Sequence, residues 1–71
     1  MAAIEWVYNA GSAWAPLDRY TQQTIEALWS QNGASWIQSS PSFGGHSIFI
    51  DTSQLILMCS GYSYTIARRY R

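Results

Sequence analysis

Few residues of this 71-residue chain could carry catalysis. His46 is the only imidazole and Cys59 the only thiol. Nucleophilic catalysis needs a nucleophile, a base and a group that orients the base. Cys59 ends an apolar segment of residues 55–59, where a thiol is usually buried and inert. His46 follows Gly44-Gly45 and is expected at the edge of a loop, so the two residues do not predict a Cys-His site.

The acidic residues and glycines do not predict catalysis either. The carboxylates are Glu5, Asp18, Glu26 and Asp51, and no two of them are adjacent as general acid and base would favour. One His and one Cys cannot supply the four ligands of a structural zinc site. Gly44-Gly45 is followed by neither a Lys nor a helix, so it is no phosphate loop. The sequence therefore predicts no enzyme, no catalytic residue, no metal site and no cofactor.

Aromatic and arginine residues favour recognition instead. Indole and phenol rings have an apolar face and one polar group, which suits stacking on a nucleobase or on a partner's side chain. Lysine is absent and the cationic residues are Arg19, Arg68, Arg69 and Arg71. The last three, at the C-terminal end, could each bind phosphate through two hydrogen bonds. For both the aromatic residues and the arginines, a purely structural role is the alternative interpretation. A small domain needs its large side chains in the core, and an arginine-rich segment is often a solvated strand end.

Length and composition limit the protein class. A chain of 71 residues holds one core, and 48% hydrophobic residues with 15% aromatic residues exclude disorder. A net charge of zero excludes general attraction to DNA. No apolar run approaches the roughly 20 residues of a membrane span, no signal peptide is visible, and one Cys cannot form an internal disulfide. We expect one monomeric intracellular domain, residues 1–71, nuclear or cytoplasmic, away from membranes and part of a longer protein.

Hydrophobic patterns in the first half predict a hairpin and a helix. Alternating Ile4, Trp6 and Tyr8 predict a strand over residues 3–8, and residues 9–12 favour a turn into a second extended segment over 13–17. Asp18 is a good N-cap for a helix over residues 19–31. Asn32-Gly33 ends this helix, whose apolar face is formed by Thr21, Ile25, Leu28 and Trp29.

Four strands are expected in the second half. A loop over residues 39–45 separates the first two of these strands, and a Ser60-Gly61 turn separates the last two. Residues 55–59 are apolar on both faces and should form a central strand. The strands cover residues 35–39, 46–51, 55–59 and 62–68, the last with Tyr62, Tyr64 and Ile66 on one face. The fold class is therefore α+β, with about six antiparallel strands curled around one helix.

Motifs of the first half resemble the WWE domain, a family named for two Trp and one Glu. Glu5-Trp6-Val7-Tyr8 looks like the opening Trp-x-aromatic strand, and Trp14-Ala15-Pro16-Leu17 is similar to Trp-x-Pro-Tyr with Leu17 in place of Tyr. Ile25-Glu26-Ala27-Leu28-Trp29 resembles the helix motif Ile-Glu-x-Ala-Tyr, and Glu26 follows Trp14 by 12 residues, as in the family.

The resemblance continues through the second half, so that it covers essentially the whole chain. Ile48-Phe49-Ile50-Asp51 followed by Leu55 looks like Tyr-x-Ile-Asp-Phe-x-x-Met, and Ile66-Ala67-Arg68-Arg69 looks like the basic final strand. The resemblance implies a strongly curled half-barrel around one helix. It also implies a non-catalytic module of ubiquitin ligases or ADP-ribosyltransferases, whose relatives bind either poly(ADP-ribose) or a protein partner.

Ligand residues transfer from the family one position at a time. The first-strand Tyr falls on Tyr8, whereas the Tyr, Gln and Arg of the other strands fall on Ile48, Leu57 and Tyr64. Arg68 in the basic last strand is a further candidate for the phosphates. Replacing a hydroxyl, an amide and a guanidinium would remove hydrogen bonds of about 0.5 to 3 kcal/mol each. The fold is therefore better supported than the ligand.

Three residues of the family motif are expected to be structural. Trp6 and Trp14 should brace the first hairpin against the helix. Glu26 should accept hydrogen bonds from backbone or indole donors of those strands, and the competing interpretation is an exposed helix carboxylate.

Two functions follow from this resemblance. The first is recognition of an ADP-ribose-type nucleotide, either iso-ADP-ribose or the terminal ADP-ribose of poly(ADP-ribose), in the mouth of the half-barrel. The second is a protein-interaction or structural module with a degenerate pocket, because Ile48, Leu57 and Tyr64 depart from the family pattern.

Overall fold

The computed structural model describes residues 3–71, which form one α-helix and six strands in the expected order. A short 3₁₀ turn, η1, lies between the third and fourth strands. The elements are β1 (Ile4–Asn9), β2 (Trp14–Pro16), α1 (Arg19–Trp29), β3 (Ala34–Ser40), η1 (Pro41–Phe43), β4 (His46–Asp51), β5 (Ile56–Cys59) and β6 (Tyr62–Tyr70). The α+β class and the antiparallel sheet are confirmed.

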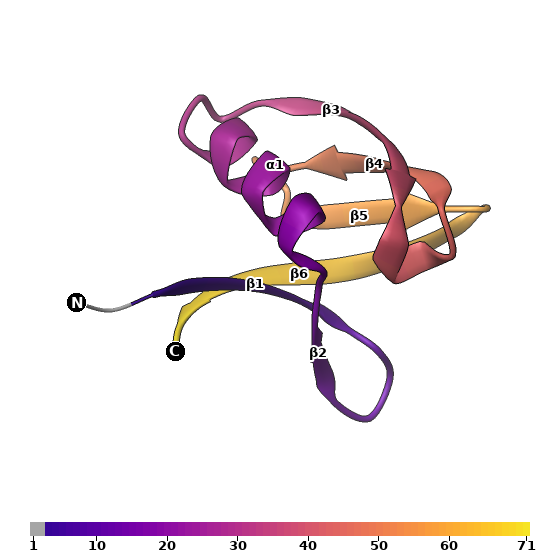
Figure 1. The fold of residues 1–71 in the computed structure, drawn as a ribbon, viewed down its shortest axis with the longest axis horizontal. Coiled ribbons are helices and arrows are strands. Elements are labelled where there is room, and N and C mark those ends of the chain that lie inside the picture. The colour runs from indigo at the N-terminus through magenta and orange to yellow at the C-terminus, as the bar shows by residue number, and fades with distance from the viewer. Residues whose placement is uncertain (1–2) are drawn as a thin grey trace.

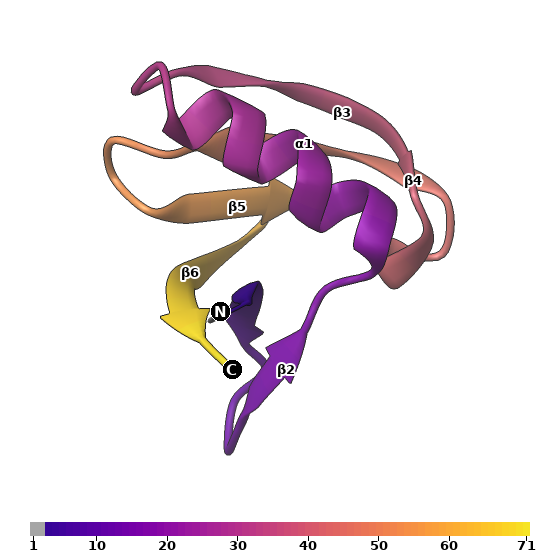
Figure 2. The same ribbon diagram turned by 60° about the vertical axis from the view of Figure 1, so that its left-hand side comes forward.

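All six strands belong to one antiparallel sheet in the order β2-β1-β6-β5-β4-β3. Figures 1 and 2 show α1 against one face of this sheet. β6 pairs with β5 and β1, and thereby brings the last strand beside the first. The Arg71 amide donates to the Ala3 carbonyl at 2.9 Å, so both ends of the described chain lie together. The edge strands of this sheet are β2 and β3.

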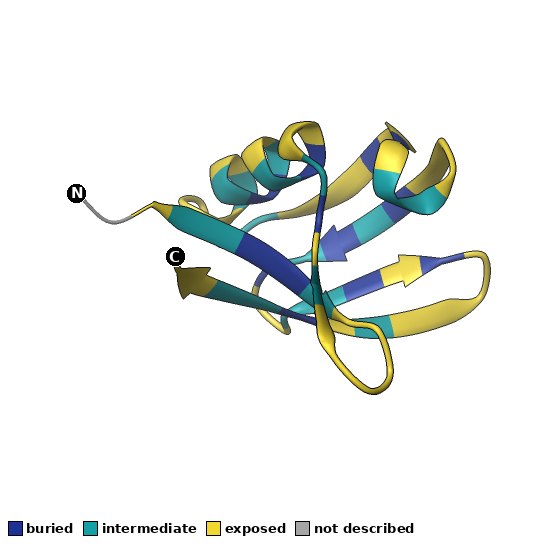
Figure 3. Ribbon diagram, turned by 60° about the horizontal axis from the view of Figure 1, so that its bottom comes forward, coloured by how far each residue is buried: buried dark blue, intermediate teal, exposed yellow. Residues whose placement is uncertain are grey.

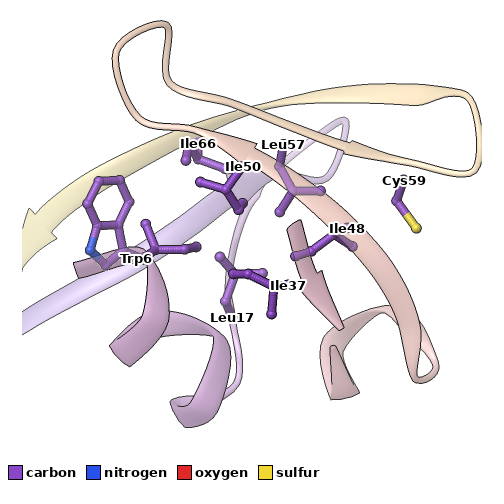
Figure 4. Packing of buried hydrophobic residues seen from close by; sticks show 9 residues of the cluster. Trp6, Leu17, Ile37, Ile48, Ile50, Leu57, Cys59 and Ile66 are labelled. Carbon is purple, nitrogen blue, oxygen red and sulfur yellow. The ribbon is translucent and has the colours of Figure 1, made fainter. Parts of the chain in front are cut away.

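The core lies between α1 and the inner face of the sheet. Because side chains of a strand alternate between its faces, Ile48 and Ile50 point inward while Phe49 points outward. Figure 4 shows the inward residues packed together, and Figure 3 shows exposed residues along the turns. The apolar core is made of Trp6, Leu17, Ile25, Ile37, Ile48, Ile50, Leu57, Cys59 and Ile66.

Asp18 begins α1 through a network that reaches η1. Its carboxylate accepts hydrogen bonds from the Thr21 amide (2.9 Å) and hydroxyl (2.6 Å) and from the Ser42 amide (3.1 Å) and hydroxyl (2.6 Å). Since the Thr21 hydroxyl proton is used on Asp18, the buried Ser40 hydroxyl donates to Thr21 Oγ1 at 2.8 Å. The N-cap prediction is confirmed, and the network also attaches the helix to β3 and η1.

The end of α1 differs in detail from the expectation. The helix ends at Trp29, and Asn32 has the positive φ of 54° that was expected of a glycine. The Asn32 amide donates to the Trp29 carbonyl and the Gly33 amide to the Leu28 carbonyl, as in a Schellman cap. An added Cβ at Gly33 would lie 3.3 Å from Leu28 Cδ2, a tight contact that the Leu28 side chain would relieve by a small shift.

Two differences concern the strands. β3 is longer than expected, because Ser39 takes a left-handed φ of 58° that lets Ser40 still pair with His46. β5 is interior to the sheet as expected, but it is not buried on both faces, since Met58 is 42% exposed. The Ser60-Gly61 turn is confirmed, with φ values of 51° and 83° that suit a tight hairpin.

Asp18 should make the stability of the fold depend on pH. Partial burial raises its pKa, but hydrogen bonds from Ser42 and Thr21 outweigh burial and lower the pKa to about 2. This contribution is present above pH 3.8, the ordinary pKa, and is lost as the pH falls through about 2. We expect Asp18→Asn to destabilise the domain at pH 7 by about 1 to 2 kcal/mol and to flatten its stability profile between these pH values. Urea unfolding at a series of pH values measures both effects, and a profile parallel to that of the wild type would contradict the network.

Candidate functional site

The Glu26 carboxylate joins the helix to two strands. Its Oε1 accepts a hydrogen bond from the Trp6 indole at 2.8 Å and from Arg68 Nε at 2.9 Å. Its Oε2 accepts a third from Arg68 Nη2 at 2.7 Å. Trp6 lies on β1 and Arg68 faces it on β6, so one carboxylate fixes α1 against both strands. The prediction that Glu26 accepts an indole hydrogen bond is confirmed.

Trp29 completes this cluster. Its ring packs edge-on against Trp6 with centroids 5.6 Å apart, and the Arg68 guanidinium lies 5.7 Å from a Trp29 ring centroid. The hydrogen bonds from Arg68 lower the pKa of Glu26, while partial burial opposes this shift. The same hydrogen bonds raise the pKa of Arg68. Arg68 therefore donates two N–H groups to Glu26 and is part of this cluster. It does not contact the other candidate ligand residues, Tyr8 and Tyr64, through any ring or hydrogen-bond interaction found among the described residues.

Trp6 and Trp14 have different environments. Trp6 is 1% exposed and braces β1 against α1 as expected. Trp14 is 44% exposed on the edge strand β2. It is therefore not buried between the hairpin and the helix, as the expected bracing role would require. Part of that role falls to Gln22, which accepts a hydrogen bond from the Trp6 amide (2.8 Å) and donates to the Leu17 carbonyl (2.6 Å).

Tyr8 and Tyr64 meet at the other end of β1, together with Phe43 of η1. The Tyr8 and Tyr64 rings are 5.7 Å apart, and Phe43 lies 5.1 Å from Tyr8 and 5.6 Å from Tyr64. All three are partly buried and pack on the core. We call these residues the aromatic triad. The sequence interpretation missed Phe43, which lies in the expected loop and had no periodic pattern to reveal it.

Ile48 and Leu57 are core residues. Both are 0% exposed, and Leu57 pairs with Tyr64 in the sheet. The structure thus brings together three of the candidate ligand residues, Tyr8, Tyr64 and Leu57. Ile48 belongs to the same core cluster but pairs with Ile37, and of the four residues only the two tyrosines are partly exposed.

A second surface lies on the outer face of the sheet. Trp36, Phe49 and Met58 are register partners across β3, β4 and β5, and we call them the outer row. Trp36 is 64% and Met58 42% exposed, and the rings of Trp36 and Phe49 pack edge-on at 5.3 Å. Trp36 could have been recognised from the alternation of Trp36 and Ile37, because only one of two neighbours can face the core.

His46 and Cys59 differ in their exposure to solvent. His46 is exposed at the start of β4, whereas Cys59 is 8% exposed within the core. Among residues 3–71, no group of three His, Cys, Asp or Glu side chains could hold a metal ion. Within the same residues, no helix has the length and apolar character that a membrane span requires.

Comparisons of this chain with protein-family models, with curated proteins and with solved structures found no match.

Glu26→Gln should separate the ion pair from the indole hydrogen bond. The amide oxygen still accepts from Trp6, but the charged pair with Arg68 is lost. We expect the melting temperature to fall by about 4 to 8 °C, as for roughly 1 kcal/mol in a domain of this size. Arg68→Gln should behave similarly. Arg71→Gln is the matched control, because Arg71 is 66% exposed and its nearest carboxylate atom is 3.8 Å away. An unchanged melting temperature for Glu26→Gln would favour an exposed carboxylate without a structural role.

Proposed function

We propose that this domain is a non-catalytic recognition module of the WWE type, from a ubiquitination or ADP-ribosylation system. In this proposal the six strands curl around α1 as a half-barrel. The element order and the Trp6–Glu26 hydrogen bond support it, because the family motif contributes both residues. In this proposal any ubiquitin ligase or ADP-ribosyltransferase activity belongs to another part of a longer protein.

The ligand in this proposal is an extended segment of a partner protein. The observation that carries it is the outer row beside the edge of β3. Monomeric proteins usually protect sheet edges with charges, prolines or bulges. Residues 34–40 contain no charged residue and no proline, and the irregularity between Ile37 and Ser40 follows Trp36. The amide and carbonyl groups near Trp36 can therefore pair with an added strand.

Charge distribution determines the chemistry of that segment. Asp51 is the only Asp, Glu, Lys or Arg between residues 27 and 67, and its carboxylate is engaged by Ser53 at 2.7 Å. An acidic partner side chain would lose water here without gaining an opposite charge, and a basic one would find only Asp51. We therefore infer an uncharged strand-forming segment, with apolar side chains at alternate positions that continue the outer row beyond Trp36.

Selection of binders from a random peptide library tests this proposal. We expect the selected peptides to be uncharged, rich in β-branched and aromatic residues, and to bind at the β3 edge. Trp36→Ser should weaken their binding roughly tenfold or more, because a large exposed anchor is removed. Trp14→Ser is the matched control on the opposite edge strand, and it should leave binding unchanged.

Three outcomes would contradict the proposal. They are peptides selected for charge, equal losses for Trp36→Ser and Trp14→Ser, and amide shifts in NMR spectra that avoid β3. Sedimentation of the domain alone gives a further check. If the outer row instead joins two copies of this chain, the sedimentation coefficient will rise with concentration, and Trp36→Ser will abolish the rise.

The aromatic triad favours a second candidate, an ADP-ribose-type nucleotide. Tyr8 and Tyr64 converge there and remain partly exposed, which would suit an adenine ring. This candidate requires Phe43 to move, because its ring packs against both tyrosine rings. Ile48 and Leu57 are 0% exposed and Arg68 is held by Glu26, so these three residues offer the nucleotide no free polar group.

Titration with iso-ADP-ribose, ADP-ribose and ATP distinguishes the two candidates. The peptide proposal expects no saturable amide shifts at Tyr8 and Tyr64 at about millimolar ligand, the range to which such hydrogen-bond losses reduce binding. Phe43→Ala is the informative variant. Saturable shifts in the wild type that strengthen in Phe43→Ala would establish the nucleotide candidate at the aromatic triad.

A further inference from the structure

A groove of about 510 Å³ lies between α1 and the first half of β1, apart from both surfaces described above. Figure 2 shows this side of the molecule, where α1 faces β1 and the end of β6. Its helical wall follows one face of α1, at positions spaced by three and four residues. The groove is lined by Ile4, Trp6, Arg19, Gln22, Gln23, Glu26 and Arg71.

The charge of this groove is positive. Glu26 is compensated by the bidentate pair with Arg68, and Glu5 is paired with Arg69 at 2.8 Å. Arg19 has no carboxylate within 4 Å among the described residues, and Arg71 reaches only Glu5, at 3.8 Å. Arg19 comes from the start of α1 and Arg71 follows β6, so the two guanidinium groups reach the groove from different elements.

The remaining lining combines apolar surface with amides. Ile4 is partly buried and Trp6 almost fully buried beneath the groove. The Gln22 amide is fixed, since it bonds the Trp6 amide and the Leu17 carbonyl. Gln23 is exposed and can turn its amide to a ligand. An apolar base with cations around it suits a ligand that has both an apolar part and an anionic group.

We propose that this groove binds a small organic oxyanion, a carboxylate or phosphate ester attached to an apolar body. Arg19 and Arg71 would hold the oxyanion, because guanidinium groups match the geometry of its oxygen atoms. Ile4 would contact the apolar body above the buried Trp6, and Gln23 would donate a neutral hydrogen bond. The volume lies within the roughly 300 to 1,000 Å³ of small-molecule sites. This site goes beyond the proposed function, since it shares no residue with the outer row or the aromatic triad.

NMR titration with four probes tests the site. Phenyl phosphate and benzoate carry both parts of the inferred ligand, whereas inorganic phosphate and phenol each carry one. We expect saturable shifts of the Trp6 indole N–H and of the Gln22 and Gln23 side-chain amides with at least one aromatic anion. Inorganic phosphate and phenol should bind at least tenfold more weakly. The stronger of the two aromatic anions identifies phosphate or carboxylate as the preferred group.

Matched arginine variants complete the test. Arg19→Gln and Arg71→Gln should each weaken binding of the aromatic anion roughly tenfold or more, because each loses a charged hydrogen bond. Asp51→Asn is the control, since it also changes the net charge by one but Asp51 lies outside the lining, and it should change the affinity less than twofold. Three results would overturn the proposal: no saturable shift with either aromatic anion, equal binding of phenol, or an equal loss of affinity for Asp51→Asn. Dispersed amide spectra of the variants would establish that they are folded.

Discussion

The buried indole of Trp6 imposes the main constraint on this domain. A buried N–H group without a partner costs roughly 1 to 3 kcal/mol, so the indole needs an acceptor within hydrogen-bond distance. Glu26 supplies that acceptor, and Arg68 compensates its charge through two further hydrogen bonds. The cluster therefore couples α1, β1 and β6. It also fixes the helix face that forms one wall of the groove.

Charged and uncharged surfaces are separated in this small domain. Glu5, Glu26 and three arginines meet where β1, α1 and the end of β6 come together, whereas β3, β4 and β5 contribute only Asp51. The net charge of zero does not reveal this separation. A strand-forming peptide suits the uncharged side because it gains backbone hydrogen bonds and apolar contacts. An oxyanion suits the charged side, so the two proposed ligands would not compete.

The sequence could predict the elements because each is determined by local patterns. Alternation in β1 and the Asp18 N-cap needed no knowledge of distant residues. Contacts between residues far apart in the sequence were harder to predict. Arg68 was expected to meet phosphate, but its partner Glu26 lies 42 positions away on the helix. Phe43 and Ser42 were assigned to a loop, since a 3₁₀ turn lacks a hydrophobic period. The long separation of such pairs is why the packing of the aromatic triad and the Asp18 network could not be anticipated.

Hydrogen exchange of the indole groups tests most directly whether Glu26 and Trp6 hold the helix on the sheet. The chain has four Trp residues, whose indole N–H signals can be followed separately by NMR. We expect the Trp6 indole to exchange slowest, only through global unfolding, because it is buried and bonded to Glu26. Trp14 and Trp36, which are 44% and 64% exposed, should exchange fast. A Trp6 indole that exchanges as fast as these two would contradict the structural role assigned to Glu26.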